Sequence, residues 1–388
     1  MKVLYVMPFK ICANKWFATG DTNQASQILS KITRFPNITV DVVGNFMDED
    51  GNSYIKFVQD NYGVNNCIDL SIISSKRTYI KSGFEILKNM NIFNEYDLIN
   101  IHNSNPSIVS KILTYLPDNN VVFTLHAPPE NMTFQFYHRE QYLQFLNDPT
   151  KLLLCVSKSH AERCLNALNY YKDYPDGNPN IKYIVNGITT ELYSNDRVYD
   201  CGTIGRFSPS KNVYESLRCV AEITRYTGGK GFYVGTGSNY EESSESQKRY
   251  VDSIMELLQN NPQIDWFESL PSNEIRALLS RSKTYLSLST IETFGLTVCE
   301  ALMQGTPSIG FDTNGIGEII EEGITGYKFS IHKSKWDLRY LESIDLYNKC
   351  LELNNDIIRS RALTRFDIDR VSKEYYDLYS GRLNNEVD

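Results

Sequence analysis

Short apolar segments alternate along the chain with longer stretches in which apolar residues recur at helical spacing. In the first half, the segments that we expect to be strands are residues 3–7, 40–43, 98–101, 121–125, 152–156 and 183–185. After a polar segment at 191–200 the rhythm starts again, with strands expected at 200–205, 231–234, 264–267, 284–288 and 308–310. Helical patterns in this second half lie near 212–226, 244–260, 272–281, 295–304 and 315–322. Because this alternation is typical of parallel α/β sheets, the sequence predicts two Rossmann-like halves with a cleft between them.

Two of the expected strands end in polar or small residues, at positions 100–102 and 124–129. In open α/β sheets, ligands bind beyond the carboxyl ends of strands, so these positions are candidates for a site. The last segment, residues 367–382, has apolar positions at near-helical spacing and predicts a final helix.

Composition narrows the class of protein. The 388 residues include 39 Lys and Arg against 47 Asp and Glu, a net charge of -8, which argues against coating nucleic acid or an anionic membrane. No apolar run approaches the roughly 18 residues of a membrane helix, and residues 1–7 lack a signal-peptide cleavage site, so we expect no transmembrane segment. The eight cysteines are scattered without a C-x-x-C pair. This argues against a disulfide framework or a structural zinc site and favours a cytoplasmic location.

Residues 289–302 have the pattern of an anion-binding helix start. They follow an expected strand and open an expected helix. The amides of a first helical turn and the positive end of the helix dipole favour a phosphate. Glu292 and Glu300 would repel that phosphate unless they bind hydroxyl groups, which a sugar nucleotide carries on its sugar and its ribose. The alternative, that both glutamates are solvated helix residues, stays open at this point.

A second segment, residues 202–212, places two cations after the strand that begins the second half. Arg206 and Lys211 are expected at the carboxyl end of that strand. Arginine binds phosphate oxygens bidentately and lysine acts as a point charge. An ordinary basic turn is the alternative, but two anion-binding signals in one half favour a phosphate-containing ligand.

These residues together resemble the retaining GT-B glycosyltransferases of the family GT4 type, known as group 1. The resemblance is carried by Gly205-Arg206…Lys211, Glu292-(seven residues)-Glu300 around Phe294-Gly295-Leu296, Asn186-Gly187, Gly305-Thr306-Pro307 and Gly323-Ile324-Thr325-Gly326. It is close over about 200–330 and weaker over 1–190.

The resemblance implies an α/β fold of the GT-B type, with two Rossmann-like domains facing across a cleft and a C-terminal helix crossing back to the first domain. Residues 1–195, with the returning helix at 367–388, would form the acceptor-side domain. Residues 196–366 would form the nucleotide-sugar donor domain.

The resemblance also implies roles for single residues. Arg206 and Lys211 would hold the donor diphosphate, Glu292 the transferred sugar and Glu300 the ribose. His126 matches a histidine that faces the sugar, and it joins Glu292, Arg206 and Lys211 as a candidate catalytic residue. The remaining candidate donor-binding residues are Gly20, Leu270, Thr293, Phe294, Gly295, Leu296 and Thr297.

Some of these residues have a more specific expected contact. The backbone of 294–296 would meet the sugar, Thr297 the phosphate, and Leu270 would lie beside the base. Gly20 is the only glycine in the stretch 8–21, where the family has a glycine-rich loop. This departure leaves the acceptor side less defined than the donor side.

The implied activity is retaining transfer of a hexosyl or pentosyl group from a nucleotide diphosphate sugar, UDP favoured over GDP, to an acceptor hydroxyl. No cofactor and no metal are expected, because Arg206, Lys211 and the helix start meet the charge on the leaving phosphate. The acceptor would be a glycan or a small molecule, with a lipid or a modified DNA base as weaker alternatives. A non-catalytic sugar-nucleotide-binding protein on the same fold is the competing function.

Overall fold

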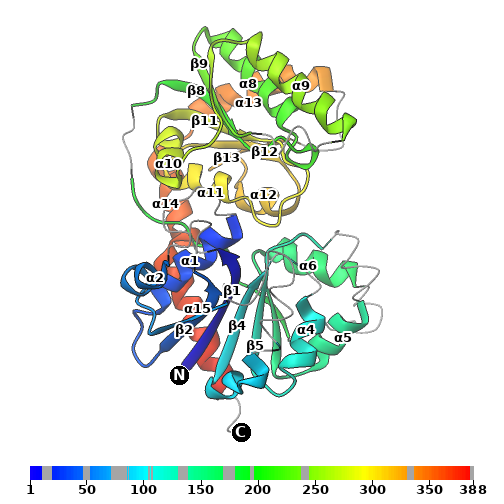
Figure 1. Cartoon of the computed structure of the whole chain (residues 1–388). Helices are drawn as coiled ribbons and strands as arrows, with labels where there is room; N and C mark the ends of the chain where they lie inside the picture. The colour runs from blue at the N-terminus through cyan, green and yellow to red at the C-terminus, as the bar shows by residue number, and fades with distance from the viewer. Residues whose placement is uncertain are drawn as a thin grey trace. The chain divides into compact units, whose positions relative to one another are not determined.

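The computed structural model describes residues 1–10, 20–46, 53–70, 85, 87–103, 105, 108–129, 139–168, 180–192, 196–236, 244–329 and 336–384. The chain divides into two compact units, each an α/β fold around one parallel sheet (Figure 1). Unit 1 comprises Met1–Thr189 and Ile368–Asp388, and unit 2 comprises Thr190–Asp367. The sequence predicted the domain boundaries after residues 195 and 366, whereas the structure has them after residues 189 and 367.

Unit 1 has a seven-stranded sheet in the order β3-β2-β1-β4-β5-β6-β7. Its strands are β1 (Lys2–Lys10), β2 (Thr39–Asn45), β3 (Asn66–Asp69), β4 (Leu98–Asn103), β5 (Val121–Leu125), β6 (Lys151–Cys155) and β7 (Ile181–Tyr183). Its helices are α1 (Gly20–Ile32), α2 (Ile55–Tyr62), η1 (Ile92–Glu95), α4 (Ile108–Tyr115), α5 (Arg139–Asn147), α6 (Lys158–Ala167) and α15 (Ile368–Asn384).

The core of unit 1 lies on both faces of this sheet. Along β1, Leu4 and Val6 belong to one buried cluster, while Val3, Tyr5 and Met7 belong to the other. This alternation is what a strand with two covered faces requires. On the second face α15 packs against α1 and contributes four buried residues to the cluster, Ile368, Val371, Tyr375 and Tyr379. The final helix therefore belongs to the core of unit 1 (Figure 1, red).

Unit 2 has a six-stranded parallel sheet in the order β10-β9-β8-β11-β12-β13. Its strands are β8 (Tyr199–Ile204), β9 (Lys230–Val234), β10 (Ile264–Phe267), β11 (Ser282–Ser287), β12 (Ser308–Phe311) and β13 (Gly326–Phe329). Its helices are η3 (Pro209–Lys211), α8 (Val213–Thr227), α9 (Glu245–Gln259), α10 (Ser272–Ser280), α11 (Leu296–Met303), α12 (Asn314–Ile319), α13 (Trp336–Leu351) and α14 (Asn355–Phe366).

Most expected elements are confirmed, and the final helix expected at 367–382 is α15. The patterns gave no bounds for the helices of the first half, placed β7 about two residues late, and missed β3, β13, α13 and α14 among the described elements. β3 is an edge strand with one exposed residue and three half-buried ones, so it lacks the apolar run that marks a central strand. Among the described residues, no helix is long and apolar enough to span a bilayer.

Candidate active site

The two anion-binding segments predicted separately lie side by side in unit 2. β8 and β11 are neighbouring parallel strands, so their carboxyl ends meet at one edge of the sheet. The carbonyl oxygen of Ser210 accepts hydrogen bonds from the Thr290 amide at 2.9 Å and the Ser289 hydroxyl at 3.1 Å. These bonds tie the turn that follows β8 to the loop that precedes α11.

An ion pair joins the same two segments. The Nζ of Lys211 lies 2.5 Å from the Oε1 of Glu292, and the two side chains are 29% and 18% exposed. A ligand at this edge could therefore reach both groups. The positive charge of Lys211 offsets the repulsion that Glu292 would exert on an anion. Arg206 is exposed on the same turn after β8 and adds a second cation.

Two glycines, Gly295 and Gly315, allow the backbone arrangement at the start of α11. Gly295 caps the helix with φ of 112°, a conformation that other residues rarely adopt. A Cβ at position 315 would lie 2.1 Å from the carbonyl oxygen of Phe294, so Gly315 lets α12 approach that backbone. The Phe294 ring is buried and packs edge-on against Phe366, with centroids 5.7 Å apart. The side chain of Phe294 is therefore part of the packing of unit 2, and a contact between the backbone of 294–296 and the sugar stays a prediction from the resemblance.

Three further candidate donor-binding residues around the start of α11 are partly buried: Thr293, Leu296 and Thr297. Thr297 Oγ1 accepts a hydrogen bond from the Tyr285 hydroxyl at 2.8 Å. Burial raises the pKa of Tyr285, so this phenol stays a neutral donor at physiological pH. With one lone pair engaged by Tyr285, the hydroxyl of Thr297 keeps its own hydrogen to donate.

Glu300 lies on α11 and is only 9% exposed. Burial raises the pKa of its carboxyl group to about 7, and the guanidinium of Arg276 opposes that rise. Arg276 also donates a hydrogen bond to Glu191, with Nη2–Oε2 of 2.9 Å. Glu300 is therefore not a solvated helix residue, and near neutral pH it is divided between its acid and carboxylate forms. Either form can hydrogen-bond a hydroxyl group.

The other candidates lie on separate elements. Leu270 is half-buried between β10 and α10 of unit 2. Gly20 opens α1 of unit 1, while residues 11–19 of the stretch compared with the family's glycine-rich loop lie outside the described residues. His126 follows β5 of unit 1 and is 9% exposed.

A buried chain of hydrogen bonds leads to His126. The side-chain amide of Asn100 donates to Nε2 of His102 at 2.9 Å, so that nitrogen is the acceptor of the ring. Burial, with a smaller effect of His126, holds the pKa of His102 well below its usual 6.5, so its ring is neutral. Its hydrogen is then on Nδ1, which donates to Nε2 of His126 at 3.1 Å. In a neutral His126, the hydrogen must therefore be on Nδ1.

This network includes residues that the sequence did not single out. Asn100 also donates to the hydroxyl of Tyr379 on α15 at 2.6 Å, and Tyr379 donates to the hydroxyl of Tyr5 at 3.4 Å. The His102 ring stacks on Tyr5, with centroids 5.1 Å apart, and meets the His126 ring through their hydrogen bond, with centroids 5.4 Å apart. The sequence identified the polar residues at 100–102 as candidates for a site. Their partners on α15 lie 279 positions later, and no local pattern joins them.

The family comparison agrees with the resemblance seen in the sequence. Residues 191–358 match the family model "Glycosyl transferases group 1". The chain is also similar to N-acetyl-alpha-D-glucosaminyl L-malate synthase of Bacillus anthracis, at 24% identity over 189 residues. That match covers 47% of this chain and spans about half, 47%, of the relative.

Solved structures show the same fold. An Anabaena HepE structure in complex with UDP-glucose matches with a TM-score of 0.72 and 16% identity, covering 98% of this chain and 100% of that one. Sucrose-phosphate synthase from Thermosynechococcus elongatus matches with a TM-score of 0.74 and 14% identity, covering 99% of both chains. The GT-B fold class expected from the resemblance is confirmed.

Proposed function

We propose that this protein moves a sugar from a nucleotide diphosphate sugar to an acceptor hydroxyl, with retention at the anomeric carbon, because residues 191–358 match the group 1 glycosyltransferase family model. The observation that carries the proposal is the Lys211–Glu292 pair at the start of α11. A nucleotide sugar joins its phosphate directly to the sugar. A phosphate-binding cation and a sugar-binding carboxylate must therefore be neighbours, as these two groups are.

The proposed chemistry follows the charge that develops during transfer. Departure of the nucleoside diphosphate builds negative charge on its terminal phosphate. Arg206, Lys211 and the first-turn amides of α11 supply positive charge at that position, so the residues themselves can stabilise the leaving group without a metal. Glu292 would accept hydrogen bonds from sugar hydroxyls, and the neutral or ionised carboxyl of Glu300 would bind the ribose.

The donor is proposed to be a UDP-sugar, with a GDP-sugar as the alternative. Support comes from the similar Anabaena structure, which holds UDP-glucose, and from the half-buried apolar Leu270 after β10, where a base could pack. Glycans and small molecules are the proposed acceptors. A contact between His126 and the sugar stays a prediction from the resemblance.

The experiment that tests this proposal uses the full chain with a panel of UDP- and GDP-sugars and a mixed pool of hydroxyl acceptors. Mass spectrometry should detect a glycosylated product with at least one UDP-sugar, and proton NMR should show that the anomeric configuration of the donor is kept. Inversion would contradict the retaining mechanism. Donor binding without product or donor hydrolysis across the panel would instead support the non-catalytic sugar-nucleotide-binding alternative.

A further inference from the structure

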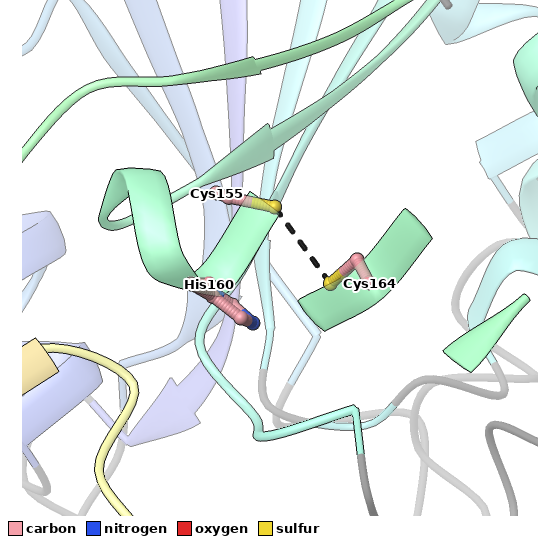
Figure 2. A group of neighbouring side chains, drawn as sticks. All are labelled: Cys155, His160 and Cys164. Atoms are coloured by element: carbon pink, nitrogen blue, oxygen red, sulfur yellow. Dashed lines mark hydrogen bonds between the residues drawn. The ribbon is translucent and has the colours of Figure 1, made fainter. Parts of the chain in front are cut away.

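Three buried side chains of residue types that bind metals meet in unit 1, and none of them has a role in the proposed sugar transfer. Cys155 is the last residue of β6, and His160 and Cys164 lie four positions apart on one face of α6. All three are fully buried, and their ligand atoms lie within 4.8 Å of one another. Figure 2 shows the three side chains pointing toward one another from β6 and α6. The sequence analysis passed over them because their spacing, Cys-x4-His-x3-Cys, contains no C-x-x-C pair.

The two sulfur atoms have the separation that one tetrahedral ion would give them. The thiol of Cys155 donates a hydrogen bond to that of Cys164 (dashed line in Figure 2), and the two Sγ atoms are 3.8 Å apart. With Zn–S bonds of about 2.3 Å and a tetrahedral angle, two thiolates on one zinc ion also lie about 3.8 Å apart. A disulfide needs an S–S bond of about 2.05 Å, so its formation would require the sulfurs to move much closer. The geometry fits shared coordination without rearrangement.

The His160 ring is held in a form that leaves one nitrogen able to bind a metal. Its Nε2 lies 2.9 Å from the carbonyl oxygen of Ala127, and a carbonyl can only accept. Nε2 therefore carries the hydrogen, and the lone pair of the neutral ring is on Nδ1. Nδ1 accepts a long hydrogen bond, 3.4 Å, from the Val156 amide, and the Cys164 thiol also hydrogen-bonds to the His160 ring. Metal-bound histidines commonly donate their second ring N–H to a backbone carbonyl in this way.

Charge balance in the buried site favours a divalent ion. Two thiolates and a neutral imidazole around Zn²⁺ have no net charge, whereas the same ligands around Cu⁺ leave one negative charge in the core. An uncompensated buried charge is costly. We propose that Cys155, His160 and Cys164 form a zinc site, ligating through the two Sγ atoms and Nδ1.

Binding would break two S–H bonds, form two Zn–S bonds and one Zn–N bond to the lone pair of Nδ1, and release two protons to the solvent. The three ligands would occupy three of the four tetrahedral positions around the ion. The ion would join β6 to α6. Through the bond from His160 to Ala127 it would also fix the backbone beside His126. The site is independent of the proposed sugar transfer, and its test needs no substrate.

The test measures zinc in the purified, tag-free full chain under reducing conditions. The protein is stripped with a chelator, incubated with Zn²⁺, desalted and analysed by plasma mass spectrometry. Wild-type protein should retain about one zinc ion per chain, and Cys155→Ala and Cys164→Ala should retain almost none. Cys219→Ala is the matched control, because Cys219 is also fully buried but lies in unit 2, and it should retain zinc as wild type does. Saturating zinc should raise the Tm of the wild type, but not of Cys155→Ala, by about 5 °C or more.

Zinc retention by the wild-type protein tests the proposal even if a variant fails to fold. Wild-type protein that retains no zinc contradicts the proposal. Uptake of Cu⁺ with no uptake of Zn²⁺ contradicts the assignment of the ion. Formation of a Cys155–Cys164 disulfide with diamide, in protein that takes up no metal, would identify an ordinary thiol pair and overturn the proposal. Folded Cys155→Ala and Cys164→Ala variants that retain as much zinc as wild type would place the ion elsewhere, with the same consequence.

Discussion

The two units use polar residues at the ends of parallel strands in different ways. In unit 2, Arg206, Lys211 and Glu292 lie on connecting segments with exposed or half-buried side chains. In unit 1, Asn100 and His102 are fully buried on β4 and are held by tyrosines of α15. The first arrangement leaves charged groups accessible to a ligand, whereas the second satisfies its hydrogen bonds internally.

This difference has energetic consequences. A half-exposed ion pair contributes little to stability, about 0–1 kcal/mol, so the groups of unit 2 can be removed at small structural cost. Removing one member of a buried network leaves its partner unsatisfied, at a cost of about 1–3 kcal/mol. Substitutions of Arg206, Lys211 or Glu292 should therefore act on ligand binding and catalysis, while those in the unit 1 network should act first on stability.

The largest expected effect is on transfer by unit 2. Lys211→Ala should lower kcat/KM by about 10²- to 10³-fold, because it removes a group that we propose stabilises the leaving phosphate. Its Tm should stay close to wild type. Lys230→Ala is the matched control, since Lys230 pairs with Asp265 at 3.9 Å at the start of β9 and has no proposed role. If steady-state kinetics show equal losses of kcat/KM for Lys211→Ala and Lys230→Ala, Lys211 has no special role in transfer and the proposed contrast between the two units is wrong.

Glu300 should make unit 2 less stable as pH rises. Its pKa is raised from 4.5 to about 7 in the folded protein, so folding favours the protonated form. The associated stability is fully present below pH 4.5 and is lost as pH rises through 7, a change of up to about 3 kcal/mol. Denaturant unfolding at several pH values should show this slope in wild type and a flatter one in Glu300→Gln. Parallel pH profiles would contradict the raised pKa.

His102 should give unit 1 the opposite dependence on pH. Because its pKa is lowered in the folded protein, its neutral form is the folded one. The stability is present above pH 6.5 and is lost as pH falls below it, by about 1.4 kcal/mol per pH unit at most. His102→Gln removes this titration and should reduce the loss of stability between pH 6.5 and 5.5. An unchanged acid slope in the variant would show that the histidine does not control it.

The smallest expected effect is a difference in unfolding free energy between substitutions of two tyrosines on α15. Tyr379→Phe removes a buried hydroxyl that accepts a 2.6 Å hydrogen bond from Asn100 and should destabilise the protein by about 1 kcal/mol or slightly more. Tyr376→Phe is its control, because the hydroxyl of Tyr376 donates an exposed bond to the Pro36 carbonyl. The control should change stability by less than about 0.5 kcal/mol. Equal changes in urea unfolding would argue against the buried network.

The sequence was more informative about the candidate site of unit 2 than about the buried network of unit 1, although β13, α13 and α14, which it missed, lie in unit 2. The residues around Glu292 are close in sequence and belong to one strand–loop–helix segment, so local patterns identify both the fold and the candidate site. The network around His102 depends on tyrosines of α15, and the cluster of Cys155, His160 and Cys164 depends on how β6 and α6 pack. Periodicity predicts that such elements exist, but it does not say which side chains meet.

Calorimetric binding of UDP and UDP-glucose to matched variants tests the assigned donor site most directly. If Lys211 binds phosphate and Glu292 binds sugar, Lys211→Ala should weaken both ligands by about tenfold or more. Glu292→Gln should weaken UDP-glucose to a similar extent and leave UDP within about threefold of wild type. Unchanged UDP binding in Lys211→Ala, or an equal loss of both ligands in Glu292→Gln, would contradict the assignment.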